Sequence, residues 1–319
     1  MKQQKQTEME ILNELFLSIK RQLVDNELKR VINHYVSDIQ LRNNILYHLC
    51  LGNNNISPTL EHSKRLRAYL CLLFAEEAGH NINDIVPLAV TVELLHNSTL
   101  IIDDIQDNDY QRCGKTALWV KVGLADAINA AYFLGLFSQS YLNIQRQNYG
   151  YFDYSTLFAE SLNKLISGQQ KDINSLNDED KSIESYYEIS IGKTGALLNM
   201  ACCLGCFPKE FNSIQSVFIK EFTDLFSCAY QIFDDLSDLN NYLISDKNKI
   251  DKSNIFYYLS KQSNLSKQNI KEALPQIKSL QSELVTKLSG SINKMKSTRI
   301  IKTEKLNQFI NTIIKSQSL

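Results

Sequence analysis

The sequence predicts an all-α protein, and three observations support this prediction. Apolar residues recur at helical spacing along most of the chain, and no run alternates convincingly at the period of two that marks a half-buried strand. The 319 residues include only 11 Gly and 4 Pro, which is low for a turn-rich β protein. No internal repeat of short period is visible. We therefore expect one helical domain over residues 1–319.

The expected elements of the first part follow from apolar spacing and from the residues that interrupt it. Residues 7–50 predict two amphipathic helices, and the polar stretch Gly52–Pro58 predicts a loop. A helix over Leu60–Ala78 is followed by a glycine, which is a C-cap signal. The next helix is expected to start after Asp84 and to run into an acidic motif.

The rest of the chain continues in the same way. Residues 108–123, which contain two glycines, predict an irregular connection. Pro208 interrupts the chain before the helix of a second acidic motif, and the polar stretch Leu239–Asp251 predicts a loop after it. Two or three lysine-rich amphipathic helices follow from about Ile255. The remaining helices are expected at Leu124–Gln147, Tyr154–Asn174 and Ile183–Gly205.

Composition excludes several classes of protein. Lys and Arg number 34 against 35 Asp and Glu, a net charge of -1, so no basic face for a nucleic acid stands out. The seven cysteines lie mostly in apolar stretches, as reduced core cysteines do, and Cys203 with Cys206 lacks the second pair of a zinc site. The start of the chain is polar, and Glu93 and His96 interrupt the most apolar run. We expect a cytoplasmic protein without a transmembrane segment.

Two acidic motifs are the most informative features of the chain. It reads DDIQD from Asp103 and DDLSD from Asp234. Residues i and i+4 share one helix face, so Asp103 converges with Asp107, and Asp234 with Asp238. Carboxylates suit Mg²⁺, which takes further ligands from water and substrate phosphates. Two such clusters facing each other would hold a diphosphate through several Mg²⁺ ions.

The residues before each motif distinguish a metal site from ordinary surface charge. A lone DDxxD on a solvated helix is common, but segments 90–102 and 222–233 are largely apolar at helical spacing. Acidic clusters at the ends of such helices predict a metal site. Further polar pairs are Lys64 with Arg67, Gln169 with Asp172, Gln231 with Asp234, and Lys193 with Thr194 in GKTG. Taken alone, each pair fits a solvated helix face as well as a phosphate site.

The order of these motifs resembles that of the trans-isoprenyl diphosphate synthases, the polyprenyl synthetase family. The shared motifs are KRLR, HN-x4-DDxxD, R-x-GK, GQxxD, KT and QI-x-DDxxD, between about Lys64 and Asp238. The resemblance implies an isoprenoid-synthase-type helical bundle around a deep central cavity, usually in a homodimer. It also implies a Mg²⁺-dependent head-to-tail condensation of an allylic diphosphate with isopentenyl diphosphate.

The resemblance implies a role for each matched residue. The metal ligands would be Asp103, Asp107, Asp234 and Asp238, with about three Mg²⁺ ions. The catalytic set would be Asp103, Asp104, Asp107, Lys193, Thr194, Gln231, Asp234 and Asp235. The allylic diphosphate would contact Arg112, Lys193 and Lys252, and isopentenyl diphosphate would contact Lys64, Arg67 and His96. Gln231 and Thr194 would line the region where the new bond forms.

Small residues before the first motif predict a long product. In this family, bulk at these positions forms the floor that stops the growing chain, and here they are Ser98 and Thr99. We expect geranylgeranyl diphosphate or a longer polyprenyl diphosphate.

The chain departs from the family pattern in three places. Cys113 stands where the family has a second Arg that binds isopentenyl diphosphate, and Lys115 is the candidate replacement. The family's Gly-Asp is absent at residues 129–132. The loop after the second motif is short, which leaves Lys247 and Lys252 as alternatives for one contact.

These departures keep other functions open beside chain elongation. Isoprenyl transferases that act on a non-diphosphate acceptor, such as a peptide tryptophan, share part of the pattern but tend to lack the second DDxxD and KRLR. A non-catalytic subunit of a heteromeric synthase is another alternative, and a terpene cyclase would need an aromatic-lined pocket. A helical scaffold without activity would not need two acidic motifs in family order.

Overall fold

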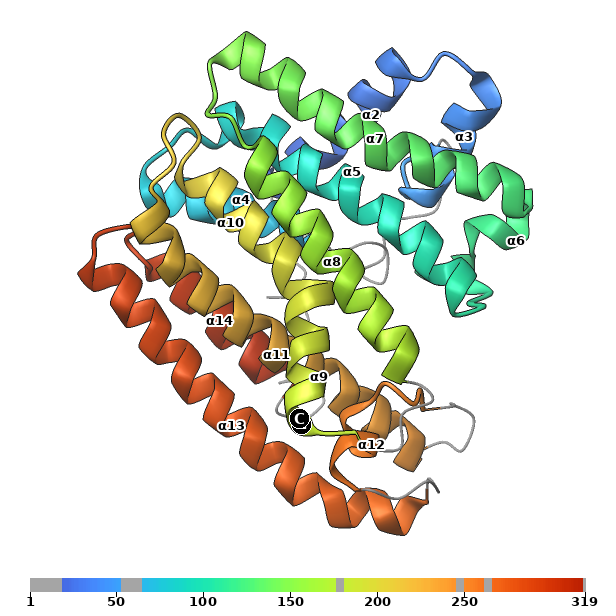
Figure 1. Cartoon of the computed structure of the whole chain (residues 1–319), viewed down its shortest axis with the longest axis vertical. Coiled ribbons are helices and arrows are strands. Elements are labelled where there is room, and N and C mark those ends of the chain that lie inside the picture. The colour runs from blue at the N-terminus through green and yellow to red at the C-terminus, as the bar shows by residue number, and fades with distance from the viewer. Residues whose placement is uncertain (1–18, 53–64, 176–180, 245–249, 261–265, 318–319) are drawn as a thin grey trace. The chain divides into compact units, whose positions relative to one another are not determined.

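The computed structural model describes residues 19–52, 65–175, 181–244, 250–260 and 266–317 (Figure 1). In these ranges the secondary structure is helical apart from one pair of two-residue strands, which confirms the all-α fold class. The chain forms two compact units. Unit 1 spans 1–155, 201–211 and 304–316, and unit 2 spans 156–200, 212–303 and 317–319. The single domain expected over residues 1–319 stays a prediction.

Unit 1 is built around α5 (Ile82–Gln106), which packs against α7 (Leu124–Tyr149), α4 (Leu66–Ala78) and α2 (Ile19–Tyr35). Figure 1 shows α5 and α7 side by side. Because neighbours cover α5 on several sides, its buried residues lie all around the helix rather than along one stripe. The unit's other helical segments are α3 (Ile39–His48), α6 (Leu118–Val122), α14 (Glu304–Gln317) and the C-terminal part of α10 (Ala196–Cys206).

Local signals set the ends of these helices. Gly79 follows α4 in the left-handed conformation, with φ of 89°, as the C-cap signal predicted. Asn81 is the N-cap of α5, because its side chain accepts a hydrogen bond from the Asn83 amide. The helix therefore begins at Ile82, earlier than the sequence predicted.

A short hairpin follows the first acidic motif, within the segment that was expected to be irregular. β1 (Gln111–Arg112) pairs antiparallel with β2 (Lys115–Thr116). Cys113 and Gly114 form the turn with φ of 52° and 70°. Two successive residues at positive φ are typical of the tightest hairpin turns. The alternation of apolar and polar residues could not reveal strands of two residues.

Unit 2 contains α11 (Ser213–Ile244) packed against α13 (Lys267–Ser297) (Figure 1). Gly168 of α8 (Ser155–Ser175) approaches Gly192 so closely that a Cβ on either would lie 2.7 Å from backbone atoms of the other. The unit's remaining helices are α9 (Ile183–Ser190), the π-helix η1 (Ile191–Gly195), α12 (Ile255–Leu259) and the N-terminal part of α10. The helices α12, α13 and α14 confirm the two or three helices expected after Ile255.

The helix that carries the second acidic motif is longer than predicted. A loop was expected from Leu239, but α11 continues to Ile244. Leu239 is fully buried and extends the stripe of Phe222, Phe226 and Leu236 by one more turn. The second motif therefore lies inside a helix and not at its end, which corrects the sequence-based expectation.

The cysteines divide into two groups. Five are buried, and Cys50 and Cys113 are half-buried. Burial raises the pKa of the thiols at Cys71, Cys202, Cys206 and Cys228. These core thiols are therefore poor nucleophiles.

Two helical segments, Ile82–Gln106 and Ile183–Cys206, are long and apolar enough to cross a membrane by composition. In the most apolar 18-residue stretch of each segment, 72% of the residues in the first and 78% in the second are buried inside the fold. Such burial is what core helices show.

Candidate active site

The first acidic motif lies at the C-terminal end of α5. Asp103 is half-buried and Asp107, the C-cap residue, is exposed. Asp104 between them is only 1% exposed. The accessible carboxylates are therefore the i, i+4 pair that was expected to bind metal.

Asp104 binds Arg112 and so ties the hairpin to the end of α5. Arg112 Nε and Nη2 both lie 2.5 Å from Asp104 Oδ1, and Nη2 lies 3.9 Å from Asp103 Oδ2. Burial raises the pKa of Asp104, and the Arg112 guanidinium opposes this rise. Asp104 was expected among the catalytic residues, and its contacts indicate that it positions Arg112.

The place of this motif in α5 is electrostatically unfavourable without a cation. A helix C-terminus carries a partial negative charge, so each carboxylate in the last turn costs about 0.3–1 kcal/mol. Asp103, Asp104 and Asp107 all lie in the last turn or directly after it. Arg112 offsets part of this charge, and a divalent cation would offset the rest.

The second motif repeats the pattern of the first in unit 2. Asp234 is half-buried, Asp238 is exposed, and Asp235 between them is buried. Both motifs therefore present the first and last carboxylates and bury the middle one.

Asp235 accepts three hydrogen bonds from within unit 2. Its donors are the Ile255 amide at 2.7 Å, the Tyr186 hydroxyl at 2.8 Å and Gln231 Nε2 at 3.2 Å. The Asn254 side chain donates to the Asp235 carbonyl at 3.2 Å. Burial raises the pKa of Asp235 to about 7, although these donors favour the charged form. Asp235 thus fastens the start of α12 to α11.

The donor sets fit Mg²⁺. Asp103 with Asp107, and Asp234 with Asp238, offer hard carboxylate oxygens at i, i+4 spacing on accessible faces. Each motif supplies few protein ligands, which suits an ion that keeps waters and binds substrate phosphates.

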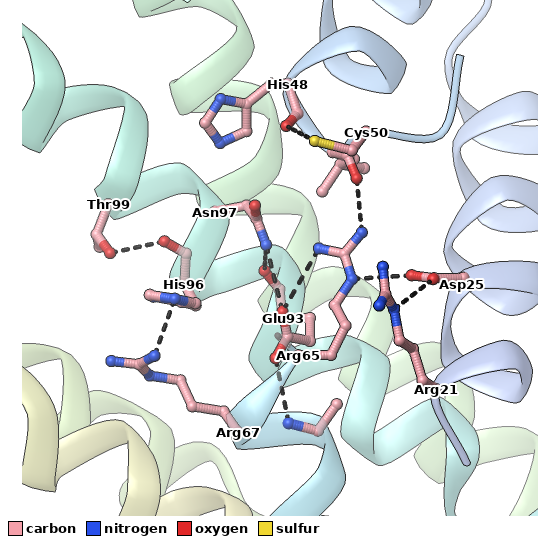
Figure 2. A network of polar contacts seen from close by, with 12 residues as sticks. Arg21, Asp25, His48, Cys50, Arg65, Arg67, Glu93, His96, Asn97 and Thr99 are labelled. Atoms are coloured by element: carbon pink, nitrogen blue, oxygen red, sulfur yellow. Dashed lines mark hydrogen bonds and ion pairs between the residues drawn. The ribbon is translucent and has the colours of Figure 1, made fainter. Parts of the chain in front are cut away.

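Arg67 and His96, which were expected to hold isopentenyl diphosphate, lie together in unit 1 (Figure 2). Arg67 Nη1 is 2.9 Å from His96 Nε2. Burial and the charges of Arg67, Arg112 and Arg65 hold the pKa of His96 well below its usual range, so the ring is neutral. Lys64, the third expected ligand, lies outside the described residues.

A buried ion-pair network fixes the start of α4 (Figure 2). Arg65 has a left-handed backbone, with φ of 49°, and a buried side chain. Its Nε donates to Asp25 at 2.9 Å, its Nη2 donates to the Leu49 carbonyl at 2.7 Å, and its Nη1 lies 3.7 Å from Glu93. Glu93 also accepts from the Ala68 amide at 3.1 Å. These contacts hold the first turn of α4 against α5.

Lys193 and Thr194 lie in the π-helix η1 of unit 2 and are both half-buried. π-helical turns are rare and are frequent at functional sites. Lys193 forms an ion pair with Asp172 of α8. The close approach of Gly168 and Gly192 brings these two elements together.

The other expected ligands of unit 2 differ in how they are held. Gln231 donates to Asp235 and is half-buried. Lys252 has an exposed side chain, and its carbonyl accepts from Lys181 Nζ at 2.6 Å. Lys247, the alternative to Lys252, lies outside the described residues.

The two expected chain-length residues have hydroxyls bonded to backbone carbonyls in unit 1. Ser98 donates to the Ala131 carbonyl of α7 at 2.9 Å, and Thr99 donates to the His96 carbonyl of its own helix at 2.8 Å. A Cβ at Gly135 would lie 2.8 Å from the Ser98 hydroxyl. Ser98 therefore lies in the seam between α5 and α7, and the role of both residues in product length stays a prediction.

Two residues around the site were not found by sequence reasoning. The sequence could have indicated Glu93, because a charged residue inside an apolar helix requires a buried partner. No sequence pattern indicates His48, since it ends an amphipathic helix with no motif around it.

Comparison with known proteins identifies the family of this chain. The polyprenyl synthetase family model matches residues 53–286. The short chain isoprenyl diphosphate synthase of Methanocaldococcus jannaschii is 29% identical over 231 residues, 72% of this chain and 65% of that protein. The octaprenyl diphosphate synthase of Escherichia coli is 26% identical over 215 residues, 66% of this chain and 61% of that protein. The matches thus span less than two thirds of these relatives' own lengths.

Solved structures show the same fold. A decaprenyl diphosphate synthase from Rhodobacter capsulatus has a TM-score of 0.72 at 16% identity, over 97% of this chain and 99% of that chain. A polyprenyl synthetase from Streptomyces coelicolor A3(2) has a TM-score of 0.70 at 21% identity, over 89% and 94%. Since the family model also matches most of the chain, this protein belongs to the polyprenyl synthetase family.

Proposed function

We propose that this protein is a Mg²⁺-dependent prenyltransferase that condenses an allylic diphosphate with isopentenyl diphosphate, head to tail. The product would be geranylgeranyl diphosphate or a longer polyprenyl diphosphate. Family membership supports the reaction class, and so do the relatives named as short chain isoprenyl and octaprenyl diphosphate synthases.

The observation that carries the proposal is the repeated pattern of the two acidic motifs. Each presents an i, i+4 pair of accessible carboxylates and buries the middle Asp, which binds Arg112 in the first motif and the Ile255 amide in the second. A structural acidic cluster would not need this division twice. The proposal requires the accessible carboxylates of each motif to bind Mg²⁺.

The residues then have defined tasks in the reaction. The allylic C–O bond breaks, and the diphosphate leaves with the electron pair. The π electrons of isopentenyl diphosphate form the new C–C bond, and a proton passes from the adjacent carbon to the departing diphosphate. Mg²⁺, when bound, supplies positive charge that stabilises the leaving group. Arg112 and Lys193 would add charge-assisted hydrogen bonds to the same group.

The experiment is a condensation assay with an allylic diphosphate, labelled isopentenyl diphosphate and Mg²⁺. We expect labelled polyprenyl product and released pyrophosphate, both lost when a chelator removes Mg²⁺. Chromatography of the dephosphorylated product gives its length. No product with any allylic substrate, at any Mg²⁺ concentration, would reject the proposal.

A second candidate is prenyl transfer to an acceptor without a diphosphate. It is favoured by one observation, the half-buried Cys113 in place of the family's second Arg. The same assay with a tryptophan-containing peptide in place of isopentenyl diphosphate tests it. Prenylated peptide without polyprenyl product would favour this candidate.

A further inference from the structure

His48 ends α3, and its imidazole is buried in unit 1 with an incomplete set of partners. The residue is 7% exposed. The ring nitrogen Nε2 has no hydrogen-bond partner among the described residues. A buried nitrogen left unpaired costs about 1–3 kcal/mol. Because buried polar atoms are nearly always hydrogen-bonded, we expect a bound molecule to be the partner of this nitrogen.

Three cations act on this ring from α4 and the hairpin. Burial and the charges of Arg112, Lys115 and Arg65 lower the pKa of His48 to about 3, so the ring is neutral. The same Arg112 and Arg65, together with His48, act on the ring of His96. The two imidazoles, from α3 and α5 (Figure 2), thus lie in one region where the same two arginines act on both. Such a region suits a polyanionic ligand.

The hairpin brings Cys113 to this region. Arg112 pairs with Lys115 across the two strands, and Cys113 lies in the turn between them. Lys115 donates to the Tyr47 carbonyl, and its Nζ lies 4.1 Å from the Tyr47 ring centre and 3.5 Å from the His48 carbonyl. Lys115 is therefore occupied with α3, and among the described residues His48 is a candidate to replace the missing Arg.

We propose that His48 Nε2 binds a phosphate group of isopentenyl diphosphate and supplies the contact that an Arg at position 113 would make. The inference rests on the proposed condensation. An anion placed among these cations favours the imidazolium form, in which both ring nitrogens donate hydrogen bonds. Binding would then take up a proton at His48. In the absence of the anion, the neutral ring avoids repulsion with Arg112 and Lys115.

The test compares His48→Phe, His48→Phe with Cys113→Arg, and the exposed control His34→Phe. We expect His48→Phe to raise the KM for isopentenyl diphosphate at least tenfold and to leave the allylic KM within twofold. Adding Cys113→Arg should restore most of the lost affinity, and His34→Phe should match wild type. If His48→Phe does not fold, His48→Gln is assayed instead, with at least a threefold rise in the same KM expected.

Calorimetry of isopentenyl diphosphate binding, without the allylic substrate, gives an independent readout. In buffers of different ionisation enthalpy, wild type should take up a proton on binding and the His48 variant should not. Unchanged KM and proton uptake would overturn the role of His48, and so would an equal rise of both KM values without rescue. If wild type binds no isopentenyl diphosphate at all, the proposed function itself fails.

Discussion

At the scale of single residues, the accessible carboxylates of the two motifs are expected to matter for turnover and not for folding. Asp103→Asn and Asp234→Asn each remove one metal ligand, and kcat should fall about a hundredfold or more, which is about 2.7 kcal/mol of transition-state stabilisation. Tm should change little. Asp84→Asn in the first turn of α5 and Asp224→Asn on α11 are matched controls. Near-normal turnover of both motif variants at limiting Mg²⁺ would contradict the metal assignment.

The buried middle carboxylates should behave in the opposite way. Asp235→Ala leaves the Ile255 amide and the Tyr186 hydroxyl buried without their acceptor. The free energy of unfolding should therefore fall by about 3 kcal/mol. Asp238→Ala, in the same motif but exposed, should change it by less than about 0.5 kcal/mol. Urea unfolding without Mg²⁺ measures both, and equal losses would show that Asp235 does not anchor α12.

His48 predicts how stability depends on pH. Its pKa is about 3 in the folded protein against 6.5 for an ordinary histidine, so the unfolded chain binds the extra proton first as pH falls. The free energy of unfolding should then fall from pH 6.5 toward pH 3, by on the order of 5 kcal/mol from this residue over the full range. His48→Phe should flatten the curve between pH 6.5 and 5 and leave its slope above pH 7.5 unchanged. Parallel curves for the two proteins in urea titrations would refute this.

At the scale of elements, the contact between α8 and η1 should be intolerant of any side chain. Gly192→Ala places a Cβ 2.7 Å from Gly168, and backbone atoms cannot yield as a flexible side chain can. We expect a loss of about 1–3 kcal/mol in the free energy of unfolding and reduced turnover, because Lys193 is next in the chain. Gly290→Ala, inside α13 with nothing within 4 Å, should instead stabilise by up to about 1 kcal/mol. Thermal unfolding of both variants measures these changes. Unchanged stability of Gly192→Ala would mean that α8 and η1 separate easily.

Element boundaries show where sequence reasoning succeeds. The C-cap glycine at position 79 set the end of α4 correctly, because a left-handed residue after a helix is a local requirement. The predicted end of α11 was wrong. Polar residues around Asn240 suggested a loop, whereas Leu239 continues the buried stripe of the helix. The strands at Gln111 and Lys115 were too short to show any alternation.

The site shows the same division between local and long-range information. The i, i+4 spacing of Asp103 and Asp107 identified the accessible carboxylates directly. The ion pair of Lys193 with Asp172 joins residues 21 positions apart in the chain, and neither alone was distinctive. His48 meets the hairpin across more than sixty residues, a contact that no local pattern encodes.

At the scale of the whole molecule, exposed apolar side chains on α7 lead us to expect that copies of this chain associate. Leu124, Tyr132 and Leu136 are 51%, 66% and 71% exposed and follow one another at multiples of four residues, so they form one stripe. The resemblance to a usually homodimeric family makes a second copy the expected partner. Light scattering should give a dimer, and Leu136→Lys should shift it toward monomer. Ile214→Lys, at a residue 78% exposed on α11, is the control.

An unaltered dimer in the Leu136→Lys variant would place the contact elsewhere. A monomeric wild-type protein would exclude the association altogether.

The cysteine thiols of this protein can report on its folding. Of seven cysteines, only Cys50 and Cys113 are partly accessible, and the other five are sealed in the core. A thiol-reactive dye should therefore label the folded protein at these two positions and all seven after denaturation, so the stoichiometry of labelling measures unfolding without any added tag. Cys113 lies beside Arg112, so its rate of modification should slow when a diphosphate is bound. Cys113 thus becomes a sensor of occupancy.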